Sequence, residues 1–266
     1  MFRNLTITCT AMVALAACAT LPNAQPVRSP LSRVDTTING SRQPGQPLIV
    51  LIHGLGSGMG TWKDLIAPLA AKHQVFAYDR PGYGNSGWTN RARTARNIAE
   101  ELHATLISAG QRPPYLVVGH SLGATYAEAF ASLYADETSG MVLIDPTVPR
   151  QQRLLEKYGL AQAIFVGNIM LAGSPMPRRE FFSLTENDAE MMRLVPFQRG
   201  PVTILMANHS GPLSPDAYVA ARHAAMAEMA ARHRARLIPI DGGHFLHKDR
   251  PGAVVEAIQQ TLSGSH

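Results

Sequence analysis

The chain has 266 residues, of which 45% are hydrophobic, so it is long enough to bury a sizeable core as one large domain or as one domain with an insertion. The formal net charge is +5, yet no basic stripe alternates with aromatic side chains, and we expect no nucleic-acid partner. No P-loop, dinucleotide-binding glycine fingerprint or metal-ligand cluster appears, so no cofactor and no metal is implied. The sequence leaves the oligomeric state open.

The N-terminus has the features of an export signal. A short positive start, "MFRN", precedes the apolar stretch "LTITCTAMVALAA", which is too short to span a bilayer with ease. The stretch ends in "LAAC" (15–18), which resembles a bacterial lipobox, and this resemblance implies that Cys18 becomes the lipidated first residue of the mature protein. We therefore expect a signal peptide over residues 1–18 and a location in the bacterial cell envelope. Ordinary cleavage nearby, giving a soluble periplasmic or secreted protein, and an uncleaved anchor are the alternatives.

The residues around Cys18 refine this expectation. Ala19 follows the cysteine at the place where an aspartate would resemble an inner-membrane retention signal, so we expect the lipid anchor in the outer membrane. The other cysteine, Cys9, would leave with the signal, and the mature chain would then have no disulfide framework. Residues 19–44 follow as a tether and N-terminal segment, in which "LPNAQPVRSPLSR" (21–33) is proline-rich.

After the tether, apolar runs typical of buried strands alternate with helical patterns. This alternation predicts a mostly parallel, doubly wound α/β sheet with helices on both faces, built from residues 45–145 and 201–266. The expected strands are 47–54, 74–80, 115–120, 141–145, 201–208 and 235–241, and the expected helices are 61–73, 95–110, 122–135, 214–233 and 251–262.

One block, residues 146–200, interrupts the alternation because it has no strand pattern between two strands. Its segments 150–173 and 183–195 are helical and apolar, and an insertion at the carboxyl edge of a parallel sheet lies where ligands bind. We expect a small helical cap or lid that shapes the substrate pocket; an ordinary packing excursion is the alternative. The methionines of the block are more typical of core packing than of a binding surface. They are Met170, Met176, Met191 and Met192.

The candidate catalytic residues lie in the loops between these predicted strands and helices. "GHSLG" (119–123) places Ser121 on a sharp turn from strand to helix, with the form G-x-S-x-G. "HGLG" (53–56) ends the first long strand, and "DGGHFLHKDRP" (241–251) follows the last one. Together with "DRPGYGNS" (79–86), these motifs resemble the α/β-hydrolase superfamily over roughly residues 45–262. The resemblance implies an α/β-hydrolase fold and a serine nucleophile.

A serine hydroxyl is a poor nucleophile at neutral pH and needs a neighbouring base. We expect His244 to be that base for Ser121, because its loop lies at the sheet edge to which Ser121 points. An acyl-transfer intermediate develops an oxyanion, which fixed main-chain N–H groups hold. The residue after the nucleophile supplies one such group, Leu122, and the resemblance implies that Leu55 in the "HGLG" loop supplies the other.

The remaining histidines are interpreted as structural. We expect His53 and His120 to be hydrogen-bonded to loop backbone, and His247 to be a packing or surface residue. His223 and His233 lie on one long helical segment and are expected to be solvated.

The acid that would orient His244 has more than one candidate position in the sequence. Most members of the superfamily carry it after the strand that corresponds to 201–208, but the first carboxylate there is Asp216, in the first turn of a helix capped by Ser214. Asp145, at the end of "MVLID", is our choice, and its strand should lie beside the strand that ends at Ser121. Asp216, Asp241 and a site without an acid are the alternatives. Asp79 is expected to brace the "RPGYG" turn, and Asp249 to cap or bracket the last helix.

These residues favour a serine hydrolase that cleaves a carboxylic ester with a small or medium apolar acyl group through an acyl-enzyme. A serine at this place disfavours haloalkane dehalogenase and epoxide hydrolase activity, since those members of the superfamily use an aspartate there. An amidase or peptidase, a carbon–carbon bond hydrolase and an acyltransferase remain as alternatives, because the fold does not select the reaction. A ligand receptor with a hydrolase fold is the alternative from outside enzymes.

Overall fold

The computed structural model describes residues 21, 23–150, 153–154, 157, 174–209 and 215–264. Its strands are β1 (Gln25–Arg28), β2 (Arg33–Asn39), β3 (Leu48–Ile52), β4 (Val75–Tyr78), β5 (Tyr115–His120), β6 (Thr138–Ile144), β7 (Val202–Ala207) and β8 (Arg236–Ile240). Its helices are η1 (Met59–Trp62), α1 (Lys63–Ala70), α2 (Ala95–Ser108), α3 (Leu122–Leu133), α6 (Met176–Phe182), α7 (Leu184–Met191), α8 (Asp216–His233), α9 (Leu246–Asp249) and α10 (Pro251–Ser263).

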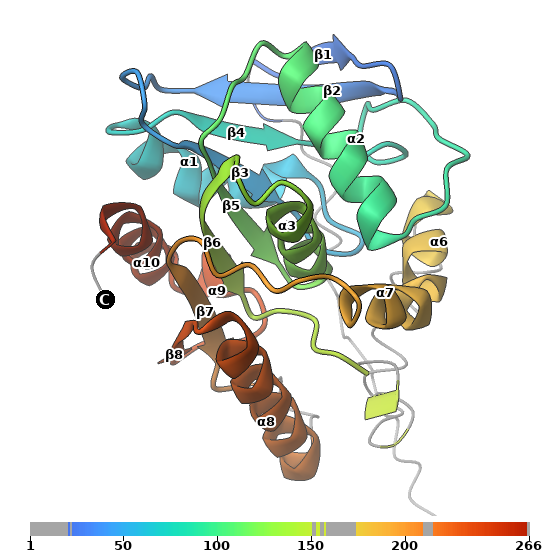
Figure 1. Cartoon of the computed structure of the whole chain (residues 1–266), viewed down its shortest axis with the longest axis vertical. Coiled ribbons are helices and arrows are strands. Elements are labelled where there is room, and N and C mark those ends of the chain that lie inside the picture. The colour runs from blue at the N-terminus through green and yellow to red at the C-terminus, as the bar shows by residue number, and fades with distance from the viewer. Residues whose placement is uncertain are drawn as a thin grey trace, which may run out of the picture.

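The strands form one eight-stranded sheet in the order β1-β2-β4-β3-β5-β6-β7-β8 (Figure 1). The pairs β1–β2 and β2–β4 are antiparallel, and every pair from β4–β3 to β7–β8 is parallel. The predicted mostly parallel sheet is therefore confirmed. So is the expected neighbourhood of residues 115–120 and 141–145, since β5 and β6 pair over their whole length.

The N-terminal segment contributes more to the sheet than its composition suggests. The proline-rich stretch 21–33, which was expected to be a tether, contains β1 and the first residue of β2. Two physical reasons account for the difference. β1 is an edge strand, where Pro26 removes no N–H that the sheet needs. β2 is rich in β-branched residues, which favour strands, and its Val34 is fully buried.

Alternate residues of each parallel strand enter two separate hydrophobic cores, one on each face of the sheet. In β3, for example, Leu48, Val50 and Ile52 pack with α2 and α3, whereas Ile49 and Leu51 pack with α1 and α10. This period of two, buried on both sides, is the reason the strands read as continuous apolar runs in the sequence. Helix α8 covers the same face as α2 and α3, through Met229 and Ala230.

The described part of the inserted block holds two short helices, α6 and α7 (Figure 1). The predicted helix at 183–195 corresponds to α7, whereas the predicted helix at 150–173 falls mostly outside the described residues. Met176 and Met191 are buried, as expected of core methionines, and Met192 is 67% exposed. Met170 lies outside the described residues.

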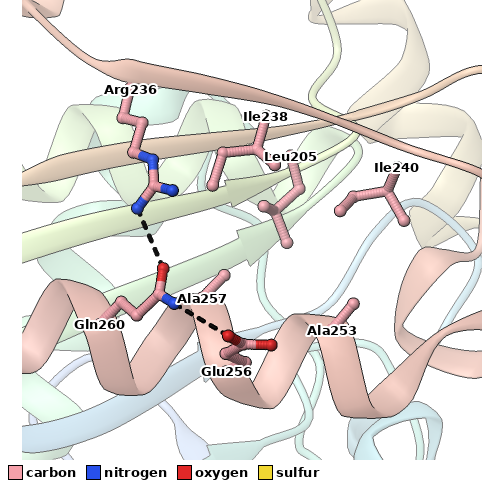
Figure 2. A pocket seen from close by; sticks show the side chains of 8 residues that line it. All are labelled: Leu205, Arg236, Ile238, Ile240, Ala253, Glu256, Ala257 and Gln260. Carbon is pink, nitrogen blue, oxygen red and sulfur yellow. Dashed lines mark hydrogen bonds between the residues drawn. The ribbon is translucent and has the colours of Figure 1, made fainter. Parts of the chain in front are cut away.

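A hollow of about 150 Å³ lies at the edge of the sheet, between β7, β8 and α10 (Figure 2). Its apolar walls come from Leu205, Ile238 and Ile240. Its polar side is a chain of hydrogen bonds in which Arg236 donates to the side-chain oxygen of Gln260 and the Gln260 amide donates to Glu256. None of the residues expected to perform chemistry lines it. None of the helices in the described segments is long and apolar enough to cross a membrane.

Candidate active site

Ser121 occupies the turn between β5 and α3 with a strained backbone. Its φ of 54° and ψ of −123° belong to a conformation that non-glycine residues rarely adopt, at a cost of about 1–3 kcal/mol. Hydrogen bonds hold the turn on both sides: the N–H of Ser121 donates to the carbonyl of Ile144 (3.0 Å), and the N–H of Ala124 donates to the carbonyl of Ser121 (3.0 Å). The sharp strand-to-helix turn predicted from G-x-S-x-G is therefore present.

The two glycines of the motif let α3 approach the sheet closely. A Cβ atom at Gly119 would collide with the backbone of Gly123 and Ala124, and a Cβ at Gly123 would collide with the carbonyls of Ile52 and His53. Only a glycine fits at either place. The motif thus fixes the start of α3 against the carboxyl ends of β3 and β5.

His244 connects Ser121 to Asp145. It lies in the loop between β8 and α9, with its Nε2 3.0 Å from the Ser121 hydroxyl and its Nδ1 2.5 Å from Oδ2 of Asp145. Ser121 and Asp145 follow the neighbouring strands β5 and β6, which explains why a single imidazole reaches both. The structure therefore brings together the three residues that the sequence selected.

Asp145 is fully buried directly after β6, at a φ of 39°. Its Oδ1 accepts a hydrogen bond from the N–H of Ala207 (3.1 Å), and its Oδ2 accepts one from Arg222 (3.1 Å) as well as facing His244. Burial alone would raise the pKa of this carboxyl. The hydrogen bond from His244 and the charge of Arg222 outweigh burial and lower the pKa to about 2, so Asp145 is a carboxylate at neutral pH.

The two alternative acids lie elsewhere. Asp216 is exposed at the start of α8, whose N-cap is Pro215 rather than Ser214, a residue outside the described ones. Asp241 is exposed and pairs with His209 and Arg250. Within the described segments, no hydrogen bond or ion pair joins either carboxylate to His244. Asp249, expected to bracket the last helix, accepts a hydrogen bond from the N–H of Gly243 and so holds the loop before His244.

The two candidate oxyanion donors are the main-chain N–H groups of Leu122 and Leu55. Leu122 is the first residue of α3, where the helix dipole is positive. The loop that carries Leu55 lies against the serine, since a Cβ at Gly54 would be 3.2 Å from the Cβ of Ser121. Neither N–H donates a hydrogen bond to another described residue.

The histidines beside the motifs are structural, as expected, and burial keeps their imidazoles neutral. Burial lowers the pKa of His53 well below its ordinary value, and its Nδ1 donates to the Gly54 carbonyl (2.9 Å). Burial and the nearby His244 lower the pKa of His120 to about 3, and its Nε2 donates to the main-chain carbonyl of His244 (2.8 Å). His247 is fully buried and bonds to Thr61 (2.7 Å).

The expectation that His233 is solvated is wrong, and that for His223 holds only in part. His233 is buried, with Nε2 2.9 Å from the Glu128 carboxylate and Nδ1 3.2 Å from the Phe197 carbonyl. His223 is half-buried and donates to the carbonyl of Ala207. The reason for His233 is its helical position: it lies eleven residues after Arg222, and so on the buried face of α8.

The sequence analysis missed two features near the candidate site. The first is Arg222, which contacts Asp145. The spacing of Tyr218, Arg222 and Met226, four residues apart, places an arginine in the apolar stripe of a helix, and that pattern was the available signal. The second is a buried ion pair between Arg80 in the "DRPGYG" turn and Glu180 of α6. The separation of 100 residues between these two left no local pattern to find.

Asp79 is buried, as a residue that braces a turn should be. Its Oδ1 accepts a hydrogen bond from the N–H of Met59 (2.7 Å), and its main-chain carbonyl accepts one from the Ser86 hydroxyl (2.6 Å). Burial raises the pKa of its carboxyl to about 6. Among the residues whose placement is described, no group of three or more His, Cys, Asp or Glu side chains could hold a metal ion.

Comparison with curated proteins finds partial matches. The chain is 40% identical over 100 residues to "Uncharacterized protein YqjL" of Bacillus subtilis, which covers 38% of this chain and 40% of that protein. It is 33% identical over 103 residues to "Putative carbamate hydrolase RutD" of Cronobacter sakazakii, which covers 38% of each. The chain thus matches about two fifths of the length of these relatives.

Solved structures match over a longer stretch. A structure described as a "putative lipase (lip1)" from Acinetobacter baumannii superposes with a TM-score of 0.69 at 16% identity, covering 91% of this chain and 92% of that one. At this identity the likeness shows the fold, and it confirms the predicted α/β-hydrolase fold. The sequence model described as "Alpha/beta hydrolase family" matches residues 49–257. Because that match covers well over half of the 266 residues, the chain belongs to the alpha/beta hydrolase family.

Proposed function

We propose that this protein is a serine hydrolase that cleaves carboxylic esters with a small or medium apolar acyl group. One observation carries the proposal: His244 is within hydrogen-bond distance of both the Ser121 hydroxyl (3.0 Å) and the buried carboxylate of Asp145 (2.5 Å). A nucleophile, a base and a group that orients the base are the parts that acyl transfer to a serine requires.

The proposed mechanism follows from the hydrogen bonds. Because Asp145 is a carboxylate, Nδ1 of His244 carries the proton, and the lone pair of Nε2 faces the Ser121 hydroxyl. Nε2 takes the hydroxyl proton as the serine oxygen attacks the ester carbonyl. The N–H groups of Leu55 and Leu122 bind the resulting oxyanion. His244 then gives its proton to the departing alcohol, and a water molecule, deprotonated in the same way, releases the acid and restores Ser121.

Hydrolysis of a carbon–nitrogen bond is the second candidate. The relative named as a carbamate hydrolase favours it, although that relative is matched over only 38% of its length. The same residues would serve an amide or carbamate, with an amine in place of the alcohol as the group that receives the proton from His244.

A fluorophosphonate probe and a substrate panel test the proposal together. The wild-type protein should be labelled once, and Ser121→Ala should abolish both labelling and turnover. Turnover is measured on p-nitrophenyl esters of increasing acyl length, with anilides and carbamates of the same acyl groups beside them. Labelling that survives Ser121→Ala contradicts the role of Ser121. If the protein prefers the anilides or carbamates, hydrolysis of a carbon–nitrogen bond becomes the better assignment and ester hydrolysis is contradicted.

We further propose that the protein is exported and lipid-anchored through Cys18 at the outer membrane. The support is the "LAAC" sequence at 15–18, which lies outside the described residues. The proposed partners are therefore a small acyl substrate and, through the anchor, a lipid bilayer.

A further inference from the structure

We propose that Arg80 is a positioning residue for the oxyanion site: it fixes the peptide group whose N–H belongs to Leu55, and Glu180 of α6 holds the guanidinium in place. The inference rests on the proposed function, because it assumes that the N–H of Leu55 donates a hydrogen bond to the oxyanion formed during acyl transfer.

The argument begins with the geometry of one peptide group. The carbonyl of Gly54 and the N–H of Leu55 belong to the same planar trans unit, so they point in opposite directions. A donor that fixes the carbonyl also fixes the direction of the N–H. Arg80 Nη2 donates to the Gly54 carbonyl (3.1 Å), and Nδ1 of His53 donates to the same oxygen (2.9 Å). Arg80 Nη1 donates to the preceding carbonyl, that of His53.

Tyr83 secures the other side of Leu55. Its hydroxyl accepts a hydrogen bond from the N–H of Gly56 (3.4 Å) and donates to Oε2 of Glu180 (2.8 Å). The loop is thus held at the residues immediately before and after Leu55. Both contacts come from the same "DRPGYG" turn, which supplies Arg80 and Tyr83.

Glu180 fixes the orientation of the guanidinium. Its carboxylate faces Arg80 with two hydrogen bonds, from Nε (2.9 Å) and Nη2 (2.8 Å), and both side chains are fully buried. Burial opposes the charge of Arg80, but Glu180 outweighs it and raises the pKa of Arg80 above its ordinary value. The guanidinium carbon also lies 4.8 Å from the centre of the Tyr83 ring and 5.0 Å from the centre of the Tyr126 ring. A charged donor polarises the peptide group that it binds and so makes the opposite N–H a better donor.

Arg93 provides a matched control within the same network. It is buried, pairs with Glu101 (2.8 Å) and lies 3.8 Å from Glu180, yet in the described part of the chain it has no hydrogen bond to the 53–56 loop. A structural role in the buried charge network is common to both arginines. The contact with the Gly54 carbonyl belongs to Arg80 alone of the two.

The test compares Arg80→Lys with Arg93→Lys. A lysine keeps the charge but cannot bridge Glu180 and two carbonyls with fixed geometry. We expect Arg80→Lys to lower kcat on a p-nitrophenyl ester by about 10- to 100-fold. This loss is smaller than the loss that follows complete removal of an oxyanion donor. KM should change less than threefold. A trifluoromethyl ketone, which forms a tetrahedral oxyanion on the serine, should bind more weakly by the same factor as kcat falls.

The control separates positioning from stability. Arg93→Lys should lower the melting temperature to a similar extent and leave both kcat and ketone inhibition within threefold of the wild type. Equal losses of kcat in the two variants, or unchanged ketone binding in Arg80→Lys, overturn the inference. A wild-type protein that is neither labelled by fluorophosphonate nor active on esters contradicts the proposed function itself, and with it this inference.

A second pair guards against a variant that does not fold. Tyr83→Phe removes the hydroxyl that joins Gly56 to Glu180, whereas Tyr126→Phe removes a buried hydroxyl that has no hydrogen-bond partner among the described residues. We expect Tyr83→Phe to lower kcat and ketone affinity together, and Tyr126→Phe to change neither. If Tyr126→Phe lowers kcat and ketone affinity as much as Tyr83→Phe does, or more, the inference is overturned even where the arginine variants do not fold.

Discussion

Asp145 is completely buried, and it keeps its charge there because hydrogen bonds from Ala207, Arg222 and His244 compensate for the loss of water. It faces His244 from the end of β6, whereas the alternative acid Asp216 is exposed at the start of α8. The acid position is therefore the point at which a substitution most directly tests the proposed chemistry.

We expect Asp145→Asn to lower kcat by a factor on the order of 10⁴, because the amide stabilises the wrong tautomer of His244. Asp216→Asn is the control and should keep most activity. Both are measured on the best ester of the panel, with circular dichroism to confirm folding. An inactive Asp216→Asn beside an active Asp145→Asn would transfer the acid role to Asp216.

Asp79 makes the stability of the fold depend on pH. Burial raises the pKa of its carboxyl from 3.8 to about 6, so the folded state holds this proton more tightly than the unfolded state does. Its contribution to the free energy of unfolding is therefore complete below about pH 4 and is lost as the pH rises through 6.

Asp79→Asn removes this dependence and keeps an oxygen that can accept from Met59. Relative to the wild type, we expect the variant to gain stability between pH 4.5 and pH 8, as measured by urea unfolding at both values. Asp216→Asn serves as control, since an exposed carboxylate pays no burial penalty. If the free energies of unfolding of Asp79→Asn and the wild type differ by the same amount at both pH values, the prediction is contradicted.

At the scale of elements, the sequence predicts what local patterns control. Buried strands appear as apolar runs because residues such as Leu48 to Ile52 are buried on both faces, and the turn at Ser121 appears because only glycine fits at Gly119 and Gly123. Local sequence patterns do not predict features of elements that depend on partners distant in the sequence. β1 needs an edge of the sheet to tolerate its proline, and the buried face of α8 needs β7 and β8, against which the helix packs, and Asp145, to which Arg222 donates.

The same limit applies to the candidate site. Ser121 and His244 could be located from motifs, and Asp145 from chain order and strand adjacency. The partners of the residues that support the site could not be predicted: the helical spacing could show that Arg222 is buried, but Arg222 and the amide of Ala207 meet Asp145 across 77 and 62 residues of sequence, and Glu180 meets Arg80 across 100. Such contacts obey no short-range spacing.

Helix α7 offers a comparison between two adjacent methionines. Met191 is buried in the core cluster with residues of α2 and α3, whereas Met192 is 67% exposed. We expect Met191→Ala to lower the free energy of unfolding by about 2–5 kcal/mol through the cavity it leaves. Met192→Ala should change it by less than about 0.5 kcal/mol.

Urea unfolding of both variants, with the acyl-length panel run in parallel, also tests whether the inserted block shapes the substrate pocket. If Met192→Ala shifts chain-length preference while Met191→Ala shifts only stability, the surface of the block faces the substrate. Equal stability for the two variants contradicts the assignment of Met191 to the core.

For the whole molecule, the observed N-terminus changes what an anchor at Cys18 would do. Because the sheet begins with β1 at Gln25, well before the first expected strand at 47–54, only six residues separate Cys18 from the sheet, a reach of at most about 25 Å from Cys18 to Gln25. A lipidated protein would then be held close to the bilayer. The acylated cysteine and an amine-linked chain together bind a membrane much more firmly than one chain does.

We expect fractionation of cells to find the wild-type protein in the membrane pellet and Cys18→Ala in the soluble fraction, each detected with the fluorophosphonate probe. Detergent, and not high salt, should release the wild-type protein, because the attachment is hydrophobic rather than electrostatic. Cys9→Ala is the matched control: this cysteine precedes the proposed cleavage site, so its loss should leave the protein in the pellet. Retention of Cys18→Ala as firm as that of the wild type would place the attachment elsewhere in the chain, and release of both by salt would point to the charge of +5 instead of a lipid.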